Sequence, residues 1–316
     1  MSSYKSVILS AESHSDIAES HTSQVIGSTI VRGPTRFATL GTPRGLKGLR
    51  ITKSSDMVAG VHRSGDPRSS KREMTTLIES FPKEALDEVF PRPSIREVAF
   101  EIRFAPRLRV NAELWKIQDE VVDQYPIVGS EQALQPNGTI LTVNVFQNPS
   151  AARAIKVSQE NFVVAFTKYT RFEDFKEEVI AKTKQFCSKF DVATIARAGL
   201  RYVNNVVVPA TEKTSAILRY VRPVVDFERV NIDNVDQFVT EVRMRHKNHL
   251  VTLRGALLGA LEDGRRIYVL DIDCHSRVQQ TAAEIPELLD EYHESAQLFF
   301  LDHVTDEYKN VMRGKS

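Results

Sequence analysis

The sequence is poor in cysteine and tryptophan and has no long apolar run. Its 316 residues include one tryptophan and two cysteines, Cys187 and Cys274, so it contains neither a disulfide framework nor a CxxC metal knuckle. No stretch approaches the roughly 20 apolar residues that cross a bilayer, and the N-terminus lacks the pattern of a secretory signal. We therefore expect a cytoplasmic protein that does not insert into membranes.

Signatures of catalysis are also missing. The sequence has no GxSxG motif, no P-loop and no GxGxxG that opens a helix. Cys274 and His275 are neighbours, but adjacent side chains on a strand point apart. His293 lies beside the apolar stripe of a predicted helix, where a packing histidine is more common than a catalytic base. The sequence therefore favours a protein without a cofactor and without catalysis over an enzyme.

The charge is divided unevenly along the chain. Residues 1–73 hold 11 Lys and Arg against 6 Asp and Glu, whereas the rest holds 31 against 35. A nucleic-acid-binding domain normally carries its basic excess in the folded part, because phosphate neutralisation supplies most of the affinity. The distribution therefore weakens a nucleic-acid interpretation and leaves room only for a local basic stripe.

The character of the sequence changes near residue 74. Residues 1–73 are rich in Ser, Thr, Gly, Arg and His, and their short apolar groups follow no period. Such a segment buries too little surface to offset its ordering entropy. We expect residues 1–73 to be either a disordered extension or an over-extended reading of the gene, with Met74 as the natural start. The folded α+β domain is then 74–316.

Two stretches show the clearest periodicity. Arg96–Phe104 alternates strictly and places Val98, Phe100 and Ile102 on one face, as a half-buried strand requires. The stretch 171–190 has apolar residues at helical spacing, acidic residues early and lysines late, as the helix dipole prefers. These patterns predict one antiparallel strand and one long amphipathic helix.

The order of predicted elements occurs twice. Halves at 90–192 and 193–313 each read β-α-β-β-β-α, and Ile102-Arg103-Phe104 is echoed by Leu200-Arg201-Tyr202. We expect two such units whose antiparallel sheets join edge to edge, with both long amphipathic helices packed on one face. The predicted strands are 96–104, 139–147, 153–158, 162–168, 194–208, 238–246, 249–261 and 265–273, and the predicted helices are 112–125, 171–190, 213–220 and 281–304.

Four segments resemble a sporadically distributed family of bacterial proteins of about 250 residues. These are PSIREVAFEIRF (93–104), AGLRYVNNVVVP (198–209), LDID (270–273) and EYHESAQLFFLDHVTDEY (291–308). Ser94 stands where a second proline is expected. The resemblance spans about 85–313 and has no counterpart for residues 1–73. It implies a shared fold and a bacterial or archaeal source, and no particular activity, substrate or cofactor.

Arginines form the best candidate for an anion site. Arg197 and Arg201 alternate around the bare backbone of Gly199, and Arg103 joins them if the two halves are pseudo-symmetric. Guanidinium groups bind phosphate or carboxylate with two parallel hydrogen bonds. The alternative is that each arginine pairs with a strand acid such as Glu101, Glu241 or Asp271. Asn204, buried in an apolar strand, is either a further ligand group or the mark of a bulge.

Asp271, Asp273 and His275 are a candidate metal site. Positions two apart on a strand point to the same side, so their side chains can converge on a divalent cation. The alternative is that Asp273 caps a turn while Asp271 pairs with an arginine on a neighbouring strand. A separate basic cluster, which includes Arg243 and Arg245, lies around a predicted hairpin turn and is either a phosphate contact or an ordinary solvated turn.

Three functions follow from these patterns. The leading hypothesis is a non-catalytic binding or sensing module that holds a partner protein or an anionic ligand on its sheet face or between its halves. The second is a nucleic-acid-binding component of a genomic-island or defence system, which the sporadic distribution of the resembling family suggests. The third is a metal-dependent hydrolase or transferase that uses Asp271 and Asp273.

Overall fold

The computed structural model describes residues 88–134, 138–223, 227 and 230–315. The predictions for residues 1–73, including the start at Met74, lie outside these residues. Within the described part, no helix is long and apolar enough to cross a membrane.

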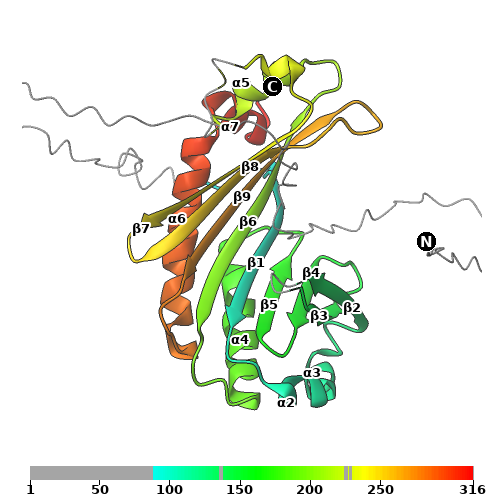
Figure 1. Cartoon of the computed structure of the whole chain (residues 1–316), viewed down its shortest axis with the longest axis vertical. Helices are drawn as coiled ribbons and strands as arrows, with labels where there is room; N and C mark the ends of the chain where they lie inside the picture. Colours follow the sequence, from blue (N-terminus) through cyan, green and yellow to red (C-terminus); the bar gives the residue numbers. More distant parts are fainter. Residues whose placement is uncertain (1–87, 135–137, 224–226, 228–229, 316) are drawn as a thin grey trace, which may run out of the picture.

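The fold is α+β and is dominated by one antiparallel sheet of nine strands (Figure 1). The strand order is β2-β3-β4-β5-β1-β6-β9-β8-β7. The sheet is continuous from one half of the sequence to the other, because β1 and β6 pair at its centre. The strands are β1 (Ile95–Arg103), β2 (Ile127–Leu134), β3 (Ile140–Gln147), β4 (Arg153–Val157), β5 (Asn161–Phe166), β6 (Arg197–Val208), β7 (Phe238–His246), β8 (His249–Leu257) and β9 (Arg266–Ser276).

Two long helices, α4 (Phe172–Lys189) and α6 (Ile285–His303), lie along this sheet (Figure 1). The Phe175 ring of α4 meets the Phe166 ring of β5 edge to face at 5.1 Å, and α6 packs on β6 and β9. The shorter helices are α2 (Leu108–Ala112), α3 (Leu114–Val121), α5 (Ile217–Tyr220) and α7 (Asp306–Met312), with single 3-10 turns η2 (Thr214–Ala216), η3 (Ile232–Asn234) and η4 (Ala282–Glu284).

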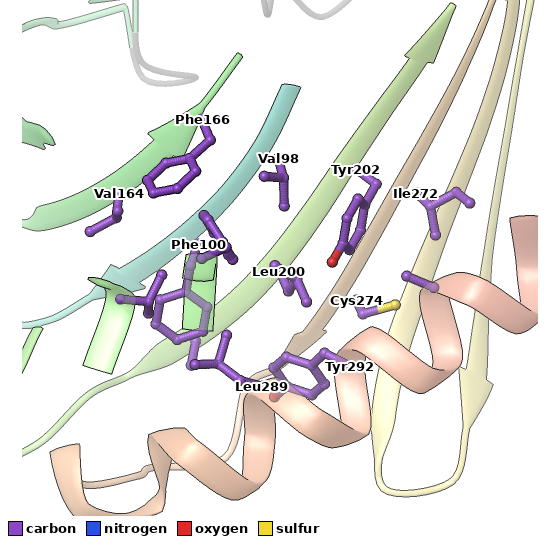
Figure 2. Packing of buried hydrophobic residues seen from close by; sticks show 14 of the residues in the cluster. Val98, Phe100, Val164, Phe166, Leu200, Tyr202, Ile272, Cys274, Leu289 and Tyr292 are labelled. Atoms are coloured by element: carbon purple, nitrogen blue, oxygen red, sulfur yellow. The ribbon is translucent and has the colours of Figure 1, made fainter. Parts of the chain in front are cut away.

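Alternate residues of the central strands form the core. Val98 and Phe100 of β1, Leu200 and Tyr202 of β6 and Ile272 of β9 lie on one side of the sheet and pack toward α6 (Figure 2). The strict alternation expected for Arg96–Phe104 is confirmed, since Val98, Phe100 and Ile102 are buried while the residues between them are half-buried. Burying each of these side chains stabilises the fold by about 1.5–3 kcal/mol.

The region between β1 and β3 differs from the prediction. The helix expected over 112–125 ends as α3 at Val121, and Tyr125 is buried with its hydroxyl donating to Glu178 at 2.8 Å. The chain then forms β2, an unpredicted edge strand whose residues from Ile127 to Gln132 are exposed. The first half therefore has four strands after its short helices, so the expected order β-α-β-β-β-α is corrected for this half by the additional strand.

Candidate functional site

The sheet face opposite the buried side chains of β1 and β6 carries a row of charged side chains. Because strand residues alternate between faces, burying Val98, Phe100 and Leu200 places the charged residues between them on the other side. We call this surface the charged face. It comprises Glu97, Glu101 and Arg103 of β1, Arg197 and Arg201 of β6, Asp271 and Asp273 of β9, Arg254 of β8, and Glu241, Arg243 and Arg245 of β7.

Arg197 connects the three central strands of the charged face. Its guanidinium donates to Glu101 Oε2 at 2.7 Å and to both Asp273 oxygens at 2.8 and 3.0 Å. The side chain lies across the bare backbone of Gly199, where an added Cβ would be 2.8 Å from Arg197 Nη1. The glycine therefore gives the guanidinium room to reach both carboxylates.

A second set of ion pairs continues toward β7. Arg201 donates to both oxygens of Asp271 at 2.7 and 2.8 Å, and the Asp271 side chain is only 7% exposed. Arg254 lies 3.4 Å from Asp271 Oδ2 and 2.5 Å from Glu241 Oε2. Burial disfavours the charge of Glu241, but hydrogen bonds from Arg254 and Arg243 and their charges outweigh it, so its pKa lies below the ordinary value.

Arg103 is held more loosely than the other arginines. Its Nε lies 3.1 Å from Glu101 Oε1, and its side chain is 43% exposed. Arg103 is directly opposite Arg197, and Ala99 is directly opposite Arg201, so the three predicted arginines share one side of a continuous sheet. Arg197 and Arg201 pair with strand acids, which is the alternative that the sequence left open for them.

Asn204 does not join the arginines. It is buried on the helix side of β6, where its side chain accepts from Ser94 Oγ at 3.2 Å and donates to the Leu270 carbonyl at 3.3 Å. The register of β1 against β6 shifts between Ile95 and Glu97, across from Asn204. The buried amide therefore accompanies an irregularity in the neighbouring strand.

The three residues of the candidate metal site have other partners. Asp271 and Asp273 each accept from guanidinium groups, and His275 Nδ1 lies 3.6 Å from Asp273 Oδ2. Burial is the main cause that lowers the pKa of His275, against the opposing charge of Asp273. In the part of the chain that the structure describes, no group of three or more His, Cys, Asp and Glu side chains is arranged to hold a metal ion. The two aspartates are thus paired with arginine side chains, and they do not converge on a shared position for a metal ion.

The two thiols are buried, and His293 lies half-buried beside the core. Burial raises the pKa of Cys187 to about 11 and raises that of Cys274 as well. His293 accepts or donates a hydrogen bond with the Tyr202 hydroxyl at 2.8 Å and stacks on the Phe172 ring at 3.7 Å between centroids. Burial lowers its pKa to about 4. His293 is therefore a neutral packing residue at physiological pH.

A shallow hollow lies between α3 and α4. It leaves about 10 Å³, roughly the space of one water molecule, with Ile117, Val121 and Phe186 among its apolar walls and Lys182 and Lys189 beside them. Lys189 is in contact with Glu120. Small-molecule sites generally enclose about 300–1,000 Å³, so this hollow is far too small to be a formed ligand site.

Sequence reasoning missed Arg254 as a member of the charged face. Its partner Asp271 is directly opposite it on β9, and Glu241 is directly opposite it on β7. The alternation of Thr252, Arg254 and Ala256 within a predicted strand was the signal that could have found it.

Comparison with known proteins adds no identification. The chain matches no protein-family model, and no curated protein matches it.

Proposed function

We propose that this protein is a non-catalytic binding module whose charged face holds a protein partner. The observation that carries this proposal is the fixed row of ion pairs from Glu101 through Arg197 and Asp273, and from Arg201 through Asp271 to Arg254. Side chains that are already fixed lose little conformational entropy when a partner binds. Charges in set positions also discriminate between partners.

The charge balance of this face favours a protein over a small anion. Arg197, Arg201 and Arg254 each contact at least one carboxylate, so a phosphate or carboxylate ligand would have to displace an internal partner. A protein surface with its own acidic and basic groups can instead meet the row at its more exposed ends. Arg103 is 43% exposed at one end and Arg243 is 63% exposed at the other.

We also infer that the two halves derive from one repeated unit, each with a long helix on the same side of the sheet. The strand order outward from the centre is β1-β5-β4-β3 in one direction and β6-β9-β8-β7 in the other. Glu101 is directly opposite Gly199, which lies 98 positions later, and Arg103 and Arg201 have the same separation. A twofold axis through the Glu101–Gly199 pair would relate the two halves. Membership of the bacterial family that the sequence resembles is a separate prediction.

A site-specific crosslinking experiment tests the binding proposal. A photoreactive amino acid placed at Arg103 and at Val207, which is 41% exposed on the same face, is expected to capture one discrete protein in the native host. The matched control is Val311 of α7, which is also 41% exposed and lies outside the charged face. Adducts of the same size and yield from all three positions would contradict the proposal.

Affinity measurements then decide the role of the charges. With the captured protein purified, Arg103→Glu is expected to weaken binding by at least about fivefold, because it reverses a charge at the contact. Lys184→Glu, an equal charge change at an exposed position of α4, is expected to leave the affinity unchanged. Equal effects of the two variants would show that net charge alone drives association. Salt-dependent binding of a short DNA duplex through the same residues would favour the nucleic-acid alternative instead.

A further inference from the structure

The outer strand β7 has a second side that faces away from the sheet. It is the last strand in the sheet order and pairs with β8 over all nine residues, from Phe238 opposite Leu257 to His246 opposite His249. No strand of the described part of the chain lies on its other side. Edge strands present a row of unpaired backbone donors and acceptors, and extended peptides bind to them by adding a strand.

The turn between β7 and β8 fixes which backbone groups are free. Two residues, Lys247 and Asn248, connect His246 to His249, and Lys247 has a positive φ of 48°. In a two-residue hairpin the closing pair shares both hydrogen bonds, and bonded and non-bonded pairs then alternate along the strands. His246, Met244 and Val242 therefore bond to β8, whereas the N–H and C=O groups of the residues between them point outward.

The side chains along this edge differ on its two faces. On the charged face, Arg243 is 63% exposed, and Arg245 is exposed with no ion pair to another described residue. Glu241, the acidic residue of this strand, is already held by Arg243 at 2.6 Å and Arg254 at 2.5 Å. On the helix side, Val242 and Met244 are only half-buried. The edge is thus cationic on one face and apolar on the other.

We propose that the free edge of β7 binds an extended segment of the partner protein in which acidic and apolar residues alternate. Such a segment would add a tenth strand to the sheet. Its acidic side chains would meet Arg243 and Arg245, and its apolar side chains would cover Val242 and Met244. This inference rests on the proposed binding function and names the chemistry of the partner.

Charge argues against two alternatives, namely a second copy of this chain paired at β7 and an acidic segment bound at β2. A second copy of this chain paired through β7 would bring Arg243 and Arg245 of both copies together, with each Glu241 already engaged. The opposite edge of the sheet, β2, has Glu131 as its single charged residue, and that carboxylate bonds Lys156 at 3.0 Å. An acidic segment therefore has matching cations at β7 and none on β2.

Peptide titration tests the proposal with the full chain. A fluorescent peptide of alternating valine and glutamate is expected to bind with a higher affinity than its valine–lysine counterpart, as followed by anisotropy. Two further peptides carry N-methyl groups at every second residue, one at the odd and the other at the even positions. Because only one of these two sets of N–H groups faces β7, one peptide is expected to lose binding and the other to bind as tightly as the unmethylated peptide. Equal binding of the two methylated forms would overturn strand addition and leave only electrostatic attraction.

Variants of the protein locate the site. The double variant Arg243→Glu/Arg245→Glu is expected to weaken peptide binding by about tenfold or more, with an unchanged circular dichroism spectrum. Lys168→Glu/Lys184→Glu, which makes the same charge change at exposed positions outside the edge, is the control and is expected to have no effect. Equal losses in both variants, or no loss in the first, would overturn the assignment to β7. If the peptides do not bind but crosslinking at Arg103 and Val207 still captures a partner, this inference is refuted and the proposed function is not.

Discussion

Among the residues of the charged face, Asp271 is the one whose substitution is expected to lower the stability of the fold most. Its carboxylate, 7% exposed, accepts two hydrogen bonds from Arg201 and lies 3.4 Å from Arg254. Asp271→Ala removes both bonds and leaves the Arg201 guanidinium, itself 21% exposed, without its bidentate partner. Breaking a fully buried ion pair costs about 3–5 kcal/mol, and losing hydrogen bonds to a charged group costs about 1.5–3 kcal/mol.

Because the Arg201 side chain is partly exposed, the expected loss for Asp271→Ala lies near the smaller of these two ranges. Arg201 keeps some contact with solvent, and Arg254 keeps Glu241, so we expect a loss of about 2–3 kcal/mol in the free energy of unfolding. This corresponds to a fall of roughly 4–12 °C in the melting temperature of a domain of this size. Urea unfolding followed by far-ultraviolet circular dichroism measures the loss directly.

Asp290→Ala is the matched control for this prediction. Asp290 also accepts from a cation, Lys176 at 2.6 Å, but its side chain is 58% exposed, and surface ion pairs contribute about 0–1 kcal/mol. A loss at Asp271 no larger than that at Asp290 would refute the reasoning, since the buried carboxylate would then contribute no more than a solvated one. Asp271→Asn, which keeps the shape and one acceptor, should fall between wild type and alanine.

Three further measurements extend this reasoning. Gly199→Ala should lower the free energy of unfolding by about 1–3 kcal/mol, because its methyl group displaces Arg197; an unchanged urea midpoint would show that the guanidinium has other room. Arg201→Ala should cost about 1–3 kcal/mol and Arg103→Ala less than about 1 kcal/mol, and equal losses would contradict the difference in pairing. His293 has a folded pKa of about 4, below its unfolded value, so its contribution is complete above about pH 6.5 and is lost as the pH falls toward 4. His293→Phe should therefore flatten the loss of stability measured between pH 6.5 and 4, and an unchanged slope would assign that loss to other groups.

The elements with strong periodicity were predictable from the sequence. Arg96–Phe104 alternates because one side of β1 is buried, and the stretch 171–190 repeats at helical spacing because one side of α4 is buried. The edge strand β2 was missed because its residues from Ile127 to Gln132 are all exposed, so burial imposes no pattern on their sequence. Hydrophobic periodicity reports burial, and it is silent where a strand has none.

The pairing of the charged residues was only partly predictable. Alternation alone places Arg197 and Arg201 on one face of β6. Which carboxylate each one meets depends on the register of β6 against β9, which brings Arg201 opposite Asp273 and next to Asp271. That register is set by contacts between strands about 70 residues apart in the chain, and no local pattern encodes it.

The central position of β1 has a consequence for synthesis. All strands of the first half, from β1 to β5, precede β6 in the chain, yet β1 needs β6 on one of its two sides. While the ribosome makes the second half, we expect β1 to be an edge strand that pairs only with β5, with its apolar side chains partly uncovered. Glu101 then lacks its later partner Arg197. Such edges pair with other nascent chains when folding is delayed. Slowing translation between α4 and β6 should therefore increase aggregation, whereas slowing it after β9 should not.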